Sequence, residues 1–319
     1  MMAQLVFLPF VVAMLISLAV TLLTITVYRG LGLIDKSTKQ DHPKHIHIKP
    51  VPRGGGIPIL VAMIFATLMF VKMDSQLAGI LLGGMILMIA GVIDDLLDIS
   101  PYIRLVLGLL AAMIVVMSGT LITFVSNPFG SGVLQFDAKL VGDMLTVLWI
   151  MWGMNFVNMG AKGLDGQLPG VTMIAAIVIG ILSFRFAGDI TAWPSTYLSF
   201  ALAGYFLAVL SILSGAKVAT AMIVLGVPLM DVVYVILRRM ASGKSPVWGD
   251  TNHLHHQLLR LGWSKRQVAG LYWAMSAILG AIALQLNSQM KIYTMLLIAI
   301  AVGGVLLWIN LFLSSNQSE

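Results

Sequence analysis

The stretch Gly91-Val92-Ile93-Asp94-Asp95-Leu96-Leu97-Asp98 decides how the rest of this chain is interpreted. Three carboxylates follow an apolar run that covers residues 77–93. Acids at the end of a membrane-length segment are costly unless a partner pairs with them. If the helix continues, Asp94 and Asp98 share a face, and the like charges then need a cation. Oxygen ligands suit Mg²⁺, which often accompanies phosphate. The alternative is a helix end capped by solvated acids.

The composition is that of a polytopic membrane protein. Of 319 residues, 59% are hydrophobic and 10% are charged, and the mean hydropathy is +0.97. A soluble domain carries about 25% charged residues. The chain has no cysteine, which excludes disulfides and thiolate metal sites. The net charge of +6 does not call for nucleic acid, and we expect no such partner, because basic loops in membrane proteins report orientation.

Apolar segments long enough to cross a bilayer recur along the chain. The first, residues 5–27, is too long for a signal-peptide core and is expected to be a retained span. We expect an all-α polytopic membrane protein with about ten transmembrane helices in one domain, residues 1–319. The candidate segments are roughly 5–27, 56–71, 77–93, 105–125, 140–157, 170–186, 196–213, 218–237, 268–286 and 292–313.

Basic residues and histidines concentrate in two loops. Residues 28–53 and 238–266 hold 12 of the 19 Lys and Arg residues and all six histidines. The positive-inside rule places both loops in the cytoplasm, and counting crossings adds the loops at 94–98 and 158–165. We therefore expect the catalytic loops on the cytoplasmic face of the inner membrane. If all of these segments cross, the second basic loop follows the eighth crossing and would lie outside. We therefore expect segment 196–213 to enter and leave on the same side, or to be tilted or broken.

The first basic loop ends in Pro50-Val51-Pro52-Arg53-Gly54-Gly55-Gly56. Prolines fix the backbone, and glycines let it approach another group closely. Lys49 and Arg53 beside such a turn suit phosphate. The alternative is a stiff basic connector that lies against anionic lipid headgroups.

A glycine-rich stretch runs from Asn155 to Gly166 and contains Asn158, Lys162 and Asp165. Amides and a carboxylate among glycines at a helix end can offer backbone donors and a ligand for a metal or a hydroxyl. The alternative is a glycine-rich helix stop.

The late loop contains Asp250-Thr251-Asn252-His253-Leu254-His255-His256. It is expected to enter a helix capped by Asp250 or Asn252, with His253 and His256 on one face and His255 pointing elsewhere. A zinc site is disfavoured because no third protein ligand stands nearby at metal-site spacing. The histidines are therefore interpreted as phosphate partners or acid–base groups.

Together these four stretches resemble the polyprenyl-phosphate N-acetylhexosamine-1-phosphate transferase family, of glycosyltransferase family 4 type. The aspartate pair and third aspartate match 94–98, and the Pro-x-Pro-Arg-x-Gly-Gly pattern matches 50–56. The Gly-Leu-Asp-Gly core matches 163–166, and the His-x-His-His signature matches 253–256. The form of this signature resembles the branch that uses UDP-N-acetylglucosamine.

The resemblance implies a Mg²⁺-dependent phosphoglycosyl transferase, with Mn²⁺ as the alternative metal. Such an enzyme transfers a sugar-1-phosphate from a UDP-N-acetylhexosamine to undecaprenyl phosphate in the lipid bilayer. It releases UMP and serves cell-envelope glycan synthesis. Whether it is a monomer or a homodimer stays open. The residues carried over as catalytic are Asp94, Asp95, Asp165, His255 and His256; as metal ligands, Asp94, Asp95, Asp98 and Asp165; and as substrate-binding, Asp35, Lys36, His47, Arg53, Asn158, Lys162 and His253.

The sequence departs from the family pattern at three places. Lys162 replaces the first aspartate of an Asp-Gly-Leu-Asp-Gly element, and Gly108 stands where a glutamine is common. A further loop with a Gly-Asp-x-Gly metal-ligand element is not found; Gly188-Asp189 is a similar dipeptide. These departures leave open a non-catalytic relative that binds polyprenyl phosphate or a nucleotide sugar.

A second alternative is a transporter that uses Asp94, Asp95, Asp143 and Asp231 as ion sites. Transporters place binding acids near the bilayer midplane, at broken helices. Most acids here lie at segment ends, which disfavours transport. Asp231, inside the eighth segment, is the exception.

Overall fold

The computed structural model describes residues 8–35, 51–52, 54–97, 99–127, 132–136, 138–161, 167–186, 218–245 and 252–315. Predicted site residues outside these ranges are Lys36, His47, Arg53, Asp98, Lys162 and Asp165, and the expected departure at 196–213 also lies outside them. The side chains of Asp35 and Asn158 are likewise not described. Predictions that concern these residues stay predictions.

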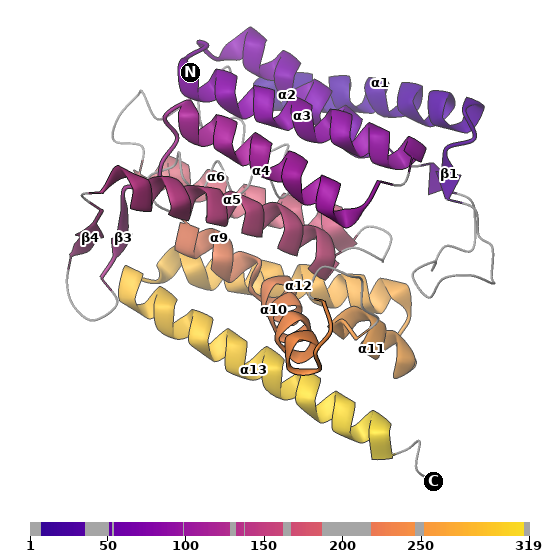
Figure 1. Cartoon of the computed structure of the whole chain (residues 1–319), viewed down its shortest axis with the longest axis vertical. Helices are drawn as coiled ribbons and strands as arrows, with labels where there is room; N and C mark the ends of the chain where they lie inside the picture. The colour runs from indigo at the N-terminus through magenta and orange to yellow at the C-terminus, as the bar shows by residue number, and fades with distance from the viewer. Residues whose placement is uncertain are drawn as a thin grey trace.

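The described chain is a bundle of helices that lie side by side (Figure 1). The helices are α1 Leu8–Gly30, α2 Gly56–Phe70, α3 Ser75–Leu97, α4 Pro101–Met117, α5 Lys139–Ala161, α6 Gln167–Phe186, α9 Val218–Val224, α10 Gly226–Ala241, α11 Leu254–Arg260, α12 Lys265–Gln285 and α13 Ser288–Ser315. Two short antiparallel ribbons add β1 Ile34–Asp35 with β2 Val51–Pro52, and β3 Phe124–Ser126 with β4 Val133–Gln135. The expected helical membrane fold is confirmed, with strands only in these connecting ribbons of the described chain.

Fewer helices than expected have full bilayer-crossing length. Within the described ranges, four helices are long and apolar enough to span a membrane, or five if the bent pair α9–α10 is one span. Shorter apolar helices cover Gly56–Phe70, Pro101–Met117 and Gly170–Ile179. The structure thus supports a multi-pass membrane protein, whereas the count of about ten crossings stays a prediction.

Glycine contacts fix the direction of the helices. Gly79 near the start of α3 packs on Ser118 beyond the end of α4, and Gly108 of α4 packs on Met154 of α5, so consecutive helices run antiparallel. In contrast, α6 and α12 run parallel, because Gly170 meets Trp273. The C-terminal ends of α1, α3 and α5 therefore lie with the N-terminal ends of α2, α4, α6 and α12 (Figure 1). This end of the bundle, which also carries β1–β2 and α11, is called the motif end below.

The segment at 218–237, expected to be one helix, is broken. It forms α9 and α10, which meet at Leu225 with a bend of 81°. Gly226 and Pro228 lie in the first turn of α10. Proline has no N–H to donate to the preceding turn, and its ring crowds that turn, so the bend has an identifiable cause. The break turns α10, and with it Asp231, away from the direction of α9.

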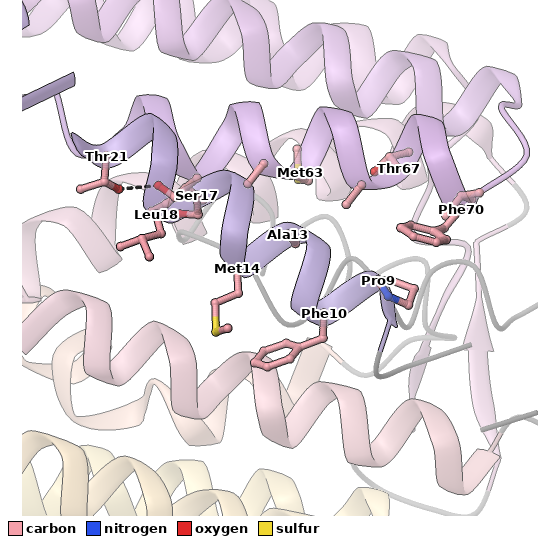
Figure 2. A pocket seen from close by; sticks show the side chains of 14 residues that line it. Pro9, Phe10, Ala13, Met14, Ser17, Leu18, Thr21, Met63, Thr67 and Phe70 are labelled. Carbon is pink, nitrogen blue, oxygen red and sulfur yellow. Dashed lines mark hydrogen bonds between the residues drawn. The ribbon is translucent and has the colours of Figure 1, made fainter. Parts of the chain in front are cut away.

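A cavity of about 390 Å³ lies between α1 and α2 (Figure 2). Phe10, Met14 and Leu18 line it from α1, and Met63 and Phe70 line it from α2. Its lining contains none of the predicted site residues. It is a mostly apolar groove along two membrane-type helices, and we therefore look for the chemistry at the motif end.

We expect Gly280→Ala to destabilise the protein. A β-carbon at Gly280 would collide with Val178 of α6, and overpacking of a filled core costs about 1–3 kcal/mol. Gly270, in the same helix, has open space at this position, so Gly270→Ala is the matched control and should be neutral or stabilising. The measurement is the midpoint of thermal unfolding in detergent. Equal midpoints for the two variants would contradict the α6–α12 packing.

Candidate active site

The acids of the organising stretch lie in the last turn of α3, at the motif end. α3 ends at Leu97, and Ser100 caps the next helix, with its hydroxyl accepting from the N–H of Ile103. The helix thus presents Asp94 and Asp95 at an end of the bundle rather than in its interior. The predicted place of Asp98 on the face of Asp94 is untested, because Asp98 lies outside the described residues.

Asp94 is paired with a cation from the next helix. The Arg104 guanidinium of α4 donates to Oδ2 of Asp94 at 3.0 Å. Arg104 is exposed, and an exposed ion pair contributes only about 0–1 kcal/mol to stability. The other oxygen, Oδ1, is buried and has no hydrogen-bond partner. The pair therefore matters more for placing a cation beside the acid than for holding the fold.

Asp95 connects α3 to the first basic loop through Tyr28. The Tyr28 phenol, at the end of α1, lies beside the Asp95 carboxylate. Gly54 packs against the Tyr28 ring so closely that a side chain there would collide with it. Gly54 also has φ +86°, which glycine adopts without strain. The Pro50–Gly56 motif and the acids of α3 therefore meet across one tyrosine, which accounts for a glycine at position 54.

The histidine motif is held by the buried acid of the broken segment. Asp231 of α10 is fully buried, and its Oδ2 lies 3.0 Å from Nδ1 of His253. Its Oδ1 accepts from the backbone N–H of Leu254, the first residue of α11, at 2.8 Å. His253 itself is the N-cap residue and makes no side-chain cap bond. The expected caps at Asp250 or Asn252 are therefore wrong, because α11 begins later and a different helix caps it.

The three histidine rings form a stack. The rings of His253 and His255 are nearly parallel, with centroids 5.6 Å apart, and those of His255 and His256 lie 4.2 Å apart at a tilt of 41°. His255 does not point away from the others, as expected from helical spacing, because His253 precedes the helix. His255 is buried and both of its ring nitrogens lack partners. Burial, and then the neighbouring His256 and His253, lower the pKa of His255 to about 2. It is therefore neutral at physiological pH, and His256 is the more exposed ring.

A buried polar cluster joins the histidine loop to the start of α6. The Tyr272 phenol of α12 lies near Asp231, the Gln167 side chain and the backbone of His255. Tyr272 and Gln167 are fully buried, and neither polar side chain has a partner that meets hydrogen-bond geometry. Gln167 directly follows the Gly163–Gly166 motif. Gln167, which follows the third motif in the sequence, therefore lies close to the fourth motif at the motif end.

The described residues supply part of the predicted Mg²⁺ site. Carboxylate oxygens are the ligands that Mg²⁺ takes, and the unpartnered Oδ1 of Asp94 fits such a role. No group of three His, Cys, Asp or Glu side chains gathers at metal-site spacing within the described ranges. The other two predicted ligands, Asp98 and Asp165, lie outside those ranges.

Reasoning from the sequence missed several residues of this site: Tyr28, Arg104, Gln167, Asp231 and Tyr272. Asp231 carried a signal, because an acid inside an apolar segment requires a partner. Its pairing with His253 also removes the main observation in favour of a transport site at that acid. The other four gave no signal beyond their residue type.

Comparison with known proteins bears on the family that the chain resembles. Residues 77–227, from α3 to the start of α10, match the family model described as glycosyl transferase family 4. Over these residues the chain is similar to glycosyl transferase family 4. The resemblance inferred from the four motifs is therefore confirmed.

Curated relatives extend the similarity over most of the length of the chain. The chain is 26% identical to a probable undecaprenyl-phosphate N-acetylglucosaminyl 1-phosphate transferase of Bacillus subtilis (strain 168), over 87% of the chain and 85% of that protein. It is 27% identical to the undecaprenyl-phosphate alpha-N-acetylglucosaminyl 1-phosphate transferase of Escherichia coli (strain K12), over 80% and 77%. A decaprenyl-phosphate N-acetylglucosaminephosphotransferase of Mycolicibacterium smegmatis is 26% identical over 72% and 70%.

The buried His255 predicts that the protein loses stability as the pH falls. The pKa of His255 is about 2 in the folded chain, against about 6.5 in an unfolded one, so below pH 6.5 only the unfolded state takes up this proton. The penalty is absent well above pH 6.5 and grows as the pH falls through that window, approaching roughly 1.4 kcal/mol per pH unit. His255→Gln should therefore flatten the pH dependence of the unfolding midpoint between about pH 7.5 and 5. An unchanged slope in His255→Gln would contradict the buried neutral ring.

Proposed function

We propose that this chain transfers N-acetylglucosamine-1-phosphate from UDP-N-acetylglucosamine to undecaprenyl phosphate and releases UMP. The observation that carries the proposal is that the acids of α3 and the histidines of α11 lie at the same end of one apolar helix bundle (Figure 1). Relatives over most of the chain are named as transferases of this kind. One substrate is a lipid and the other is water-soluble, so a site at helix ends suits both.

The chain's own groups suit phosphoryl transfer, which depends on positioning and charge neutralisation more than on covalent help. Asp94 and Asp95 would orient the phosphate of the lipid acceptor for attack on the β-phosphorus. Arg104, beside Asp94, supplies a cation where phosphate charge must be neutralised. His256, the more exposed histidine, would contact the pyrophosphate of the donor, and the neutral His255 would support its ring.

Mg²⁺, with Mn²⁺ as the alternative, would be held by Asp94 and Asp95, with Asp98 and Asp165 as the further predicted ligands. When bound, such a cation neutralises phosphate charge and draws both substrates together. The orphaned oxygen of Asp94 supports this assignment. The remaining predicted contacts, from Asp35, Lys36, His47, Arg53, Asn158, Lys162 and His253, are proposed to bind the substrates.

We infer that the motif end faces the cytoplasm and that the membrane is the inner membrane. Basic residues at this end outnumber those at the other end of the described helices, and positive charge favours the cytoplasmic side. Described basic residues at the motif end include Arg29, Arg104, Arg260, Lys265 and Arg266, against Lys72, Lys139, Arg185 and Lys291 at the other end. UDP-sugars are cytoplasmic, so this orientation gives the donor access to the site.

The test of the proposal is UMP release from UDP-N-acetylglucosamine by the purified protein with Mg²⁺ and undecaprenyl phosphate. Release that requires both the lipid and the metal is the expected result. Release without lipid would indicate nucleotide-sugar hydrolysis. Absence of release with intact binding of either substrate would leave a non-catalytic relative.

We expect Asp94→Asn and Asp95→Asn each to lower turnover at least about a hundredfold, because groups that handle protons or orient reactants contribute about 10²–10⁴ in rate. Asp143→Asn is the matched control, since Asp143 lies at the start of α5, at the end of the bundle away from the motifs. The measurement is the initial rate of UMP release at matched unfolding midpoints. Wild-type rates for both α3 variants would remove these acids from the mechanism.

A further inference from the structure

Asp231 has no place in the motifs of the family resemblance, yet it is fully buried and bonded to the histidine loop. A carboxylate placed inside an apolar bundle costs several kcal/mol unless hydrogen bonds compensate it. Such an acid is retained where its position serves a purpose. The contacts of Asp231 indicate which group it positions.

Its two oxygens are divided between the side chain and the backbone of the same loop. Oδ2 contacts Nδ1 of His253 at 3.0 Å, and Oδ1 accepts from the N–H of Leu254 at 2.8 Å. An ionised carboxylate only accepts hydrogen bonds, so with Asp231 ionised the donor in this contact is Nδ1–H of His253. Nε2 of His253 is then the nitrogen that remains for other work. The contact with Asp231 determines which ring nitrogen of His253 carries the proton. The hydrogen bond from the Leu254 N–H to Asp231 determines where α11 begins.

Through contacts between the rings, the position of His253 affects the positions of the other two histidines. His253 stacks on His255, which contacts His256, the most exposed of the three. A rotation of His253 would displace the rings stacked on it. The bend at Leu225 turns α10 and thereby brings Asp231 to the loop. An uninterrupted span would not carry the acid in this direction.

We propose that Asp231 is a positioning residue for the histidine motif: its buried carboxylate fixes the Nδ1–H tautomer of His253 and the start of α11, and through the ring stack it sets the histidine that meets the donor pyrophosphate. The expected effect of Asp231 on the kinetics rests on the proposed function. The tautomer and the helix start do not depend on that function. Asp231 itself touches neither substrate.

Asp231→Asn is the decisive variant because it keeps the shape of the side chain. Its amide nitrogen can donate to Nδ1 of His253, which moves the ring proton to Nε2. Loss of a group that orients a functional histidine typically costs about 10- to 100-fold. We expect kcat/KM for UDP-N-acetylglucosamine to fall by this factor while KM for undecaprenyl phosphate is unchanged.

The matched control is Asp74→Asn. Oδ1 of Asp74 accepts from the backbone N–H of Leu77 at 2.8 Å, which is the same kind of bond at the start of a helix. Asp74 lies before α3, at the end of the bundle away from the motifs. This variant should keep both kinetic constants. A loss in Asp231→Asn that affects donor and acceptor equally, or that Asp74→Asn reproduces, would reduce Asp231 to a fold-supporting acid and overturn the proposal.

A measurement that needs no turnover keeps the proposal separate from the proposed function. In protein labelled with ¹⁵N-histidine, the signals of His253 are identified by their loss in His253→Gln. In the wild-type chain we expect the proton on Nδ1, and in Asp231→Asn we expect it on Nε2. A wild-type ring without a proton on Nδ1 overturns the proposal even if Asp231→Asn does not fold. If the wild-type protein releases no UMP but the ring result holds, the proposed function fails and the positioning of His253 by Asp231 stands.

Discussion

A charged group in an apolar helix bundle must either lie at an end of the bundle or find a partner inside it. The described part of this chain contains charged groups of both kinds. Asp94 and Asp95 lie in the last turn of α3, where Arg104 and Tyr28 meet them. Asp231 lies inside, where His253 and the start of α11 satisfy both of its oxygens. The site is the place where these two solutions come together, at the motif end.

The break between α9 and α10 serves the same constraint. A straight span would keep its polar residue among apolar neighbours, whereas the 81° bend carries Asp231 toward α11. The buried Tyr272 and Gln167 then continue the polar cluster toward the residue that follows the glycine motif. Each of these polar groups would destabilise an apolar bundle if it were buried alone, and here they lie together in one region. There they can support a phosphate-binding surface.

Hydropathy predicted most of the fold, because bilayer-length apolar segments are directly visible in sequence. Segments 77–93 and 268–286 became α3 and α12 almost within their expected bounds. The bend at Leu225 was not predicted, because hydropathy carries no information on the direction of a helix. Gly226 and Pro228 were the residues that could have indicated a break. The contact of Asp231 with His253 was also not predicted. The two residues are 22 positions apart, and the sequence does not determine which residue contacts a buried acid.

The spacing of the motifs predicted which chemistry to look for, but not its supporting residues. The histidines were expected on a helical face, yet His253 precedes α11 and stacks on His255. Arg104 lies ten residues from Asp94 on another helix, and only the α3–α4 turn brings the two together. Residue types and spacing therefore identify a family, whereas partners depend on helix packing.

A shared site at the motif end requires that the motif loops lie on the same side of the membrane, and this can be measured directly. This cysteine-free chain accepts single cysteines cleanly. Ser100 lies between α3 and α4, Ser245 follows α10, and both are exposed. Ser100→Cys and Ser245→Cys should react with a membrane-impermeant thiol reagent from the same side, and Asn287→Cys, between α12 and α13, from the opposite side. Reaction of Ser100→Cys and Ser245→Cys from opposite sides would contradict a shared site at the motif end.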